Sequence, residues 1–302
     1  MSSAPERPRR RTKQGWARAI PLAPALLFVV AVTQIPFAIT LYYSFHRLNL
    51  VTSPRARYDG VANFASIIRN GVFQLAILNT AIITISVVVI SIFVGGLLAT
   101  GLRRDFPGCS IARTLAITPF FVMPVAAALF WKTGLYDPTF GILGWITSTV
   151  HLGRIDWISS FPRLSVILVS AWQWSAFALL ILLAGMQSFP EDVAEAAAID
   201  GAGRLYVFRR LMLPHLRPFI ELTGLLTSMY VIQTFAAIAV LTAGGPAYAT
   251  TNLSYEVYLE AFSSFNIGRA SAFGIVALVI SIALVLPVLK IVSGLFREGG
   301  RA

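Results

Sequence analysis

Six stretches of the chain contain no Asp, Glu, Lys or Arg, and each is long enough to cross a membrane. A membrane-spanning helix needs about 20 predominantly apolar residues to cover a hydrocarbon core about 30 Å thick. Lipid offers no hydrogen bonds, so stretches of this length must satisfy their backbone groups internally, as helices do. The sequence therefore predicts an all-α membrane protein with about six transmembrane helices: Ala19–His46, Gly71–Leu102, Thr114–Trp131, Leu164–Pro190, Leu222–Tyr255 and Ala270–Leu289.

The third stretch is the shortest of the six. It contains Pro119 and Pro124. Proline removes a helical hydrogen bond, so these two residues predict either a break that frees carbonyl groups or a simple kink.

Composition excludes several functional classes. Hydrophobic residues make up 57% of the 302 residues and charged residues 12%, against about a quarter charged in a soluble domain. The net charge of +11 would indicate nucleic-acid binding in a soluble protein. Here the basic residues are concentrated in the connections between apolar stretches and are explained by membrane topology, so we expect no nucleic-acid partner. The single cysteine, Cys109, excludes an intrachain disulfide. His46, His151 and His215 lack metal-ligand spacing, so no metal site is expected.

The distribution of basic residues predicts the orientation. About two-thirds of the 24 Lys and Arg residues fall in the N-terminal tail, the 103–113 and 188–218 loops and the C-terminal end. Cytoplasmic loops carry such an excess, which places both termini and these loops in the cytoplasm. We expect a single transmembrane domain over 18–296, after a basic, disordered cytoplasmic tail at 1–17 and before a C-terminal tail at 297–302.

The polar 188–218 loop is the main interruption of the apolar sequence. Long structured connections are usually functional. Ser188 and Glu191 have the spacing of a capping box, with Pro190 in the first turn, which predicts a helix start. The alanine-rich run that follows favours helix, and Gly201 can end it.

A second short helix is predicted directly after this turn. It covers Arg204–Met212 and is stopped by Pro214. The loop is therefore interpreted as a helix–turn–helix on the cytoplasmic face that contacts another protein.

Motifs for chemistry are missing from the sequence. No Gly-x-x-x-x-Gly-Lys-[Ser/Thr] occurs, and none of the three lysines follows a glycine. The chain therefore has no P-loop for ATP. No Gly-x-Ser-x-Gly elbow occurs either. We expect no enzyme activity and no cofactor bound by this chain.

Polar side chains within the apolar stretches are the candidate substrate contacts, because each must be satisfied in a bundle or a wet cavity. Aromatic faces with amide and hydroxyl groups suit a neutral polyhydroxylated ligand. At helical spacing, positions 227, 230 and 234 share one face. The alternative is that these residues join helices, as Ser, Thr and Gln often do. The candidates are Ser170, Gln173, Trp174, Thr227, Tyr230, Gln233 and Thr234.

One spaced pattern in the 188–218 loop carries a family resemblance. Glu195-Ala196-Ala197 is followed after three residues by Gly201, and after nine more by Leu211-x-Leu213-Pro214. This resembles the bacterial ABC importer permeases, with Leu in place of Ile at 211. In that family the loop forms coupling helices that sit in a cleft of the ATP-binding subunit. The resemblance implies ATPase-coupling roles for Glu195, Ala196, Ala197, Asp200, Gly201, Leu211, Leu213 and Pro214.

Other segments resemble the carbohydrate-uptake branch. Pro119–Lys132 and Ala171–Trp174 look most like the sorbitol/mannitol permeases, and permeases for disaccharides and glycerol phosphate share much of this pattern. The resemblance implies a type I importer permease in the bacterial cytoplasmic membrane that translocates a neutral sugar or polyol. In a related disaccharide importer the mid-membrane contacts lie on spans four and five, and the resemblance carries this pattern to Ser170, Gln173 and Trp174 and to Thr227 and Thr234.

The resemblance also implies partners. They are an extracytoplasmic substrate-binding protein, a second homologous permease subunit forming a heterodimer, and two ATP-binding subunits, which use ATP and Mg. The lipid bilayer surrounds the complex.

Two other classes of protein remain as alternatives. A self-sufficient proton-coupled carrier needs a carboxylate within its spans, and the six stretches contain none. A structural or assembly protein would keep its function when Gln173 or Trp174 is changed, whereas an importer would change its substrate preference.

Overall fold

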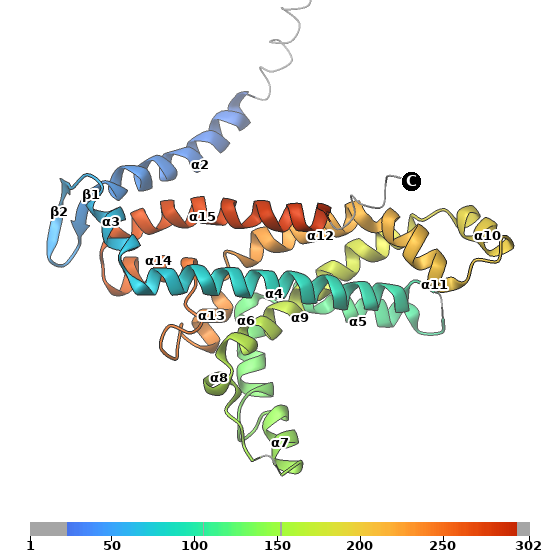
Figure 1. Ribbon diagram of the computed structural model, residues 1–302. Helices are drawn as coiled ribbons and strands as arrows, with labels where there is room; N and C mark the ends of the chain where they lie inside the picture. Colours follow the sequence, from blue (N-terminus) through green and yellow to red (C-terminus); the bar gives the residue numbers. More distant parts are fainter. Residues whose placement is uncertain (1–22, 105, 152, 295–302) are drawn as a thin grey trace, which may run out of the picture.

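The computed structural model describes residues 23–104, 106–151 and 153–294, and the predicted tails at 1–17 and 297–302 lie outside this part. The long helices α4, α9, α12 and α15 form an elongated bundle, and α2 leaves it at an angle (Figure 1). The α2, α4 and α9 helices are each long and apolar enough to cross a membrane. These long helices are α2 (Ala23–Ser44), α4 (Gly71–Leu102), α9 (Pro162–Gln187), α12 (Leu213–Val231) and α15 (Ile267–Gly294).

The third apolar stretch is broken rather than kinked. It forms α5 (Cys109–Phe121) and α6 (Pro124–Phe130), and a π turn at Trp131–Leu135 follows. The two parts meet at 104°, and as a bent pair they count as a fourth span. Pro119 lies near the end of α5 and Pro124 begins α6, so the two prolines flank the break. Pro124 stands in a first turn, where its missing N–H is tolerated, whereas Pro119 removes a hydrogen bond from the last turns of α5.

The predicted fifth span is wrong in extent. The α12 helix ends at Val231, and two short helices, α13 (Ala236–Leu241) and α14 (Leu253–Tyr258), follow before a π turn at Leu259–Ser263. Asn252 explains the interruption. Its side chain donates to the Thr234 carbonyl at 2.6 Å, and its Oδ1 accepts the Tyr255 N–H that begins α14. These bonds satisfy backbone groups that a continuous helix would use.

The segment between α2 and α4 contains the only strands in the described residues, which the all-α prediction did not include. β1 (His46–Asn49) pairs antiparallel with β2 (Ser53–Tyr58), and α3 (Ala62–Ile68) follows. The Asn63 side chain donates to the carbonyls of Ser44 and His46, both at 3.0 Å, and so ties α3 to the hairpin. The helical class holds for the membrane-crossing part.

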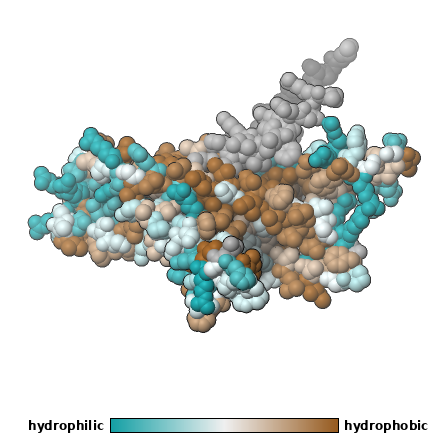
Figure 2. Space-filling view, turned by 60° about the horizontal axis from the view of Figure 1, so that its bottom comes forward, coloured by the Kyte–Doolittle hydropathy of each residue, from teal (hydrophilic) through white to brown (hydrophobic). Residues whose placement is uncertain are grey.

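Small residues let α4 and α9 pack closely. A Cβ on Gly95 would lie 2.6 Å from the Ala178 Cβ and 2.8 Å from the Leu179 nitrogen. Such close backbone approach is typical of helix pairs in membranes. Figure 2 shows apolar side chains gathered over the middle of the long helices, with hydrophilic ones toward the two ends. Beyond α6, the short helices α7 (Ile142–Thr149) and α8 (Trp157–Ser160) project from the bundle (Figure 1).

Candidate functional site

The polar loop after α9 begins with α10 (Glu191–Ile199), but the predicted capping box is wrong. Ser188 is the C-cap residue of α9. Its hydroxyl donates to the Gly185 carbonyl at 2.9 Å and lies 3.1 Å from His215 Nε2. That hydroxyl is therefore already used, and Pro190 stands at the N-cap. Glu191 and Asp192 lie in the first turn, where carboxylates interact favourably with the helix dipole.

Gly201 ends α10, as predicted. Its φ is +81°, a left-handed conformation that favours glycine. The Ala202 N–H donates to the Ala197 carbonyl at 2.9 Å, and the Gly201 N–H to the Ala198 carbonyl at 3.1 Å. This pair of bonds is the Schellman arrangement, which closes a helix C-terminus.

The α10 helix is a presented surface and not part of the core. None of its residues is buried, Ile199 is 86% exposed, and Glu195, Ala196 and Asp200 are exposed as well. In Figure 1, α10 lies beyond the ends of the long helices. The exposed side chains of this short helix are therefore available for contact with another protein.

Pro214 does not stop the second helix, which corrects the prediction. The α11 helix (Arg204–Val207), the π turn η3 (Phe208–Met212) and α12 follow one another without a gap. The Leu213 N–H donates to the Phe208 carbonyl, a bond that spans five residues. This shift in register leaves Pro214 in the first turn of α12, where its missing N–H is tolerated. Leu211 packs on the buried cluster beneath the loop.

The α9 and α12 helices bring several candidate substrate contacts together. Trp174 of α9 stacks on Tyr230 of α12, with ring centroids 5.4 Å apart and an interplanar angle of 28°. Tyr230 is 64% exposed, so one side of this stack is open. Gln173 points elsewhere, because its Nε2 donates to the Val122 carbonyl at 2.8 Å, in the break between α5 and α6.

Two buried hydroxyl residues lie on the same pair of helices. Ser170 and Thr227 are 4% and 0% exposed. Within the described residues, Thr227 Oγ1 has no hydrogen-bond partner. An unpaired buried hydroxyl costs free energy, which a ligand hydroxyl can recover.

Thr234 does not lie on the predicted helical face, and Gln233, a further candidate contact, lies outside α12 as well. Both follow the end of α12, where the N–H groups of Gln233 and Thr234 donate to the carbonyls of Tyr230 and Val231. The Gln233 side chain returns to the Met229 carbonyl at 3.3 Å. Position 234 therefore leaves the face shared by Thr227 and Tyr230.

Sequence reasoning missed two aromatic side chains beside this stack. Phe120 of α5 and Phe177 of α9 complete a cluster with Trp174, with ring centroids 5.2 to 6.0 Å apart. The position of Phe177 three residues after Trp174 on one helix was an available signal. Phe120 is brought in only by the packing of α5 on α9.

Residues 88–297 match the family described as binding-protein-dependent transport system inner membrane component. A probable ABC transporter permease protein, y4oQ, of Sinorhizobium fredii is 35% identical over 269 residues, covering 88% of this chain and 86% of its own length. The trehalose/maltose transport system permease protein MalF of Thermococcus litoralis is 28% identical over 296 residues, with 96% of each chain covered. An sn-glycerol-3-phosphate permease, UgpA, of Agrobacterium fabrum is 30% identical over 268 residues, with 87% and 90% covered.

The fold matches a solved importer. The crystal structure of a bacterial ABC transporter involved in the import of alginate aligns with a TM-score of 0.78 at 21% identity, covering 93% of this chain and 96% of that one. This likeness confirms the predicted type I importer-permease architecture. Family membership confirms the multi-pass membrane location and a transport subunit that is not an enzyme. The chain belongs to the family of inner-membrane components of binding-protein-dependent transport systems, the permease subunits of ABC importers.

Proposed function

We propose that this permease translocates a neutral sugar or sugar alcohol, delivered by an extracytoplasmic binding protein and driven by separate ATPase subunits. The observation that carries the proposal is the uncharged surface where α9 meets α12. It is formed by the stacked rings of Trp174 and Tyr230, of which Tyr230 is largely exposed, above the fully buried Thr227 of the same helix.

The geometry separates the candidate contacts by role. The unpaired hydroxyl of Thr227 costs about 1–3 kcal/mol, but this side chain is fully buried and would meet a ligand only if α9 and α12 moved apart. The open side of the Trp174–Tyr230 stack offers aromatic faces to the C–H groups of a sugar or polyol. Gln173, in contrast, already has a partner in Val122, which supports the role of joining helices.

Two relatives define the alternative substrates. They are named for trehalose/maltose and for sn-glycerol 3-phosphate. A phosphate ester is charged and would need a cation in the pathway, whereas the candidate residues on α9 and α12 include no Lys or Arg. This supports a neutral substrate. The choice of sugar alcohol over disaccharide rests on the resemblance at Pro119–Lys132 and Ala171–Trp174.

The ATPase-coupling role of the 188–218 loop is supported by its geometry. The α10 helix is exposed, acidic at its start and closed by Gly201. We propose that Glu195, Ala196, Ala197 and Asp200 contact an ATP-binding subunit. Two such subunits, which bind ATP and Mg, would move this loop, while a second homologous permease completes the pathway.

The test is ATP-dependent uptake into proteoliposomes that contain the whole complex and its binding protein. Sorbitol, mannitol, maltose, trehalose and glycerol 3-phosphate are offered separately as radiolabelled substrates. We expect uptake of a neutral compound, and an altered preference in Trp174→Ala with complex assembly retained. Uptake restricted to glycerol 3-phosphate, or transport by the isolated chain, would overturn the proposal.

A further inference from the structure

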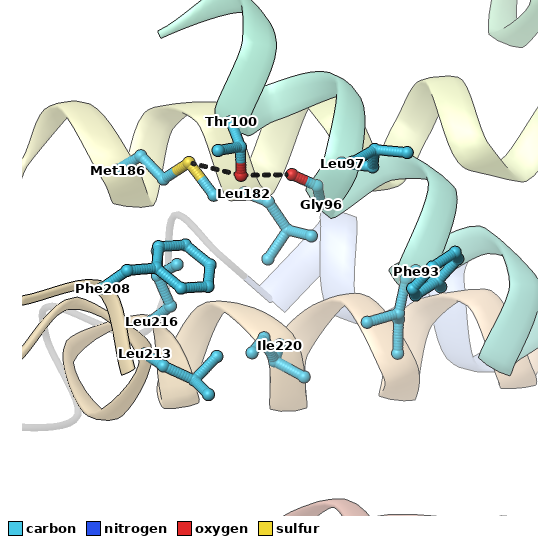
Figure 3. A pocket seen from close by; sticks show the side chains of 11 residues that line it. Phe93, Gly96, Leu97, Thr100, Leu182, Met186, Phe208, Leu213, Leu216 and Ile220 are labelled. Atoms are coloured by element: carbon cyan, nitrogen blue, oxygen red, sulfur yellow. Dashed lines mark hydrogen bonds between the residues drawn. The ribbon is translucent and has the colours of Figure 1, made fainter. Parts of the chain in front are cut away.

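An apolar groove lies along α4, between α9 and α12 (Figure 3). Its volume is about 390 Å³. Its one polar side chain, Thr100, has its hydroxyl engaged by the Gly96 carbonyl at 2.8 Å and the Met186 sulfur at 3.9 Å. The groove therefore offers a ligand only apolar contact. Its other walls include Phe93, Leu97, Leu182, Leu213, Leu216 and Ile220.

The groove continues into a larger cavity with a different lining. This arginine cavity has a volume of about 720 Å³ and shares Thr100, Met186 and Phe208 with the groove. Three guanidinium groups line it, from Arg103 and Arg104 after the end of α4 and from Arg204 at the start of α11. The apolar groove thus adjoins a cavity that is lined by three arginines.

The charge of the arginine cavity is not balanced by its other walls. The α10 helix contributes Ala194 and Ala198 to it, and no Asp or Glu among the described residues lines it. Glu191 lines a separate space of about 220 Å³ together with Arg103 and Arg113. Arg103 Nη1 donates to the Met212 sulfur at 3.7 Å, a neutral partner that leaves the guanidinium charge unbalanced.

The position of the arginine cavity matches a membrane surface. It lies where the apolar α4 and α9 helices end, at Leu102 and Gln187. The excess of basic residues in the loops assigns this end to the cytoplasmic side. Bacterial and other cytoplasmic leaflets carry anionic lipids, and basic pockets between transmembrane helices bind their head groups.

We propose that the groove and the cavity together bind one anionic phospholipid of the cytoplasmic leaflet. Its acyl chain lies in the apolar groove, and its phosphate lies among Arg103, Arg104 and Arg204. A soluble anion would use the arginines and leave the groove empty. A transmembrane helix is about 10–12 Å wide, so it would cover the groove rather than fill it. The lipid couples the end of α4 to the α10–α11 elbow, because both elements line the cavity.

The head-group contact is tested by native mass spectrometry, which detects the lipid that stays bound to the purified complex. The complex is released from nanodiscs made either of phosphatidylglycerol alone or of phosphatidylcholine alone. We expect retained phosphatidylglycerol on the natural protein and a roughly thirtyfold loss of its affinity in Arg103→Gln/Arg104→Gln. Arg209→Gln/Arg210→Gln is the matched control, because it removes an adjacent pair of exposed arginines outside both cavities. Equal loss in both variants, or equal retention of phosphatidylcholine, would overturn the proposal.

The acyl-chain contact is tested separately. At Gly96 a Cβ would meet the Leu182 side chain at 3.6 Å, an ordinary contact. Gly96→Ala should therefore keep the lipid, whereas Gly96→Phe should fill the groove and displace it. Retention of the lipid in Gly96→Phe would exclude the groove as its site.

A photo-crosslinking side chain at Leu97, which is 64% exposed, identifies the occupant by adduct mass. A phospholipid adduct supports the proposal. An adduct with the second permease overturns it, as does displacement of phosphatidylglycerol by millimolar inorganic phosphate.

Discussion

The Gln173 side chain of α9 donates a 2.8 Å hydrogen bond to the carbonyl of Val122, inside the break between α5 and α6. Val122 is extended, with φ −73° and ψ 129°, so its carbonyl is available to a partner outside the helix. A side chain on one helix therefore fixes the sharp bend of another. This bond assigns the bend to packing between segments rather than to the two prolines alone.

Loss of that bond should loosen the bend. We expect Gln173→Leu to lower the stability of the purified complex by about 1 kcal/mol, because the Val122 carbonyl loses its partner. Thermal unfolding in detergent is the measurement. Gln233→Leu is the control, since that exposed amide makes only a 3.3 Å bond within its own turn. Equal melting temperatures for the two variants would contradict the assigned role.

Neighbouring glycines of α4 should respond differently to the same change. Gly95→Ala forces a Cβ against the backbone of α9, at 2.8 Å from the Leu179 nitrogen, whereas Gly96→Ala meets only a movable leucine side chain at 3.6 Å. We expect Gly95→Ala to cost about 1–3 kcal/mol through overpacking and Gly96→Ala to be close to neutral. The yield and melting temperature of the purified complex measure both. Matching values would mean that α4 and α9 lie further apart.

Substitutions in the turn after α10 should act through backbone strain and not through steric clashes of the added side chain. A Cβ on Gly201 or on Gly203 meets nothing within 4 Å, but only Gly201 has a positive φ. Gly201→Ala therefore costs about 1–2 kcal/mol of backbone strain, while Gly203→Ala is tolerated. We expect weaker co-purification of the ATP-binding subunit and slower uptake in Gly201→Ala, with normal membrane insertion. Loss of the partner in Gly203→Ala alone would refute this account.

Low pH should weaken the hydrogen bonds that cap the start of α8. The Ser159 hydroxyl and N–H, together with the Ile158 N–H, hold the pKa of the Asp156 carboxyl below its ordinary value. A carboxyl with a lowered folded-state pKa stabilises the fold above its unfolded pKa, and this contribution is lost as the pH falls through the folded value. We expect faster amide exchange at Ile158 and Ser159 below about pH 4, after correction for intrinsic exchange. Asp156→Asn, which caps without titrating, should show no such step.

The apolar segments and the turn at Gly201 could be predicted from the sequence because each depends on local chemistry. Charge-free runs located α4 and α9, and the glycine alone marks the left-handed turn. The fifth segment could not be placed in the same way. The turn at Gly244-Gly245-Pro246, between α13 and α14, is readable from the sequence. The bond from Asn252 back 18 residues to the Thr234 carbonyl is not, because hydropathy contains no such information.

Two local rules failed for an identifiable reason. The hydroxyl of Ser188 satisfies the turn before it rather than the helix after it, so a correct capping spacing produced a wrong cap. Pro214 continues a helix because the Leu213 N–H reaches the Phe208 carbonyl. The helix propensity of a residue is a local property, whereas the register of the backbone hydrogen bonds depends on the whole segment. The candidate contacts on α9 were correctly predicted to lie on a helix. Their interaction partners, such as Val122 for Gln173 and Tyr230 for Trp174, depend on how the helices pack and could not be predicted.

The uninterrupted run from Arg204 to Val231 has a mechanical consequence. Arg204 at the base of α11 and Thr227 belong to one continuous helical segment and lie about 35 Å apart at the rise of an α-helix. A push on the lower end must either shift Thr227 or be absorbed where the segment is weakest. Two places interrupt its regular hydrogen bonding: the π turn at Phe208–Met212, and Pro218 within α12, which has no N–H to donate. The stiffness of the helix at these two places thus limits how much of a displacement at α11 reaches Thr227 and Tyr230.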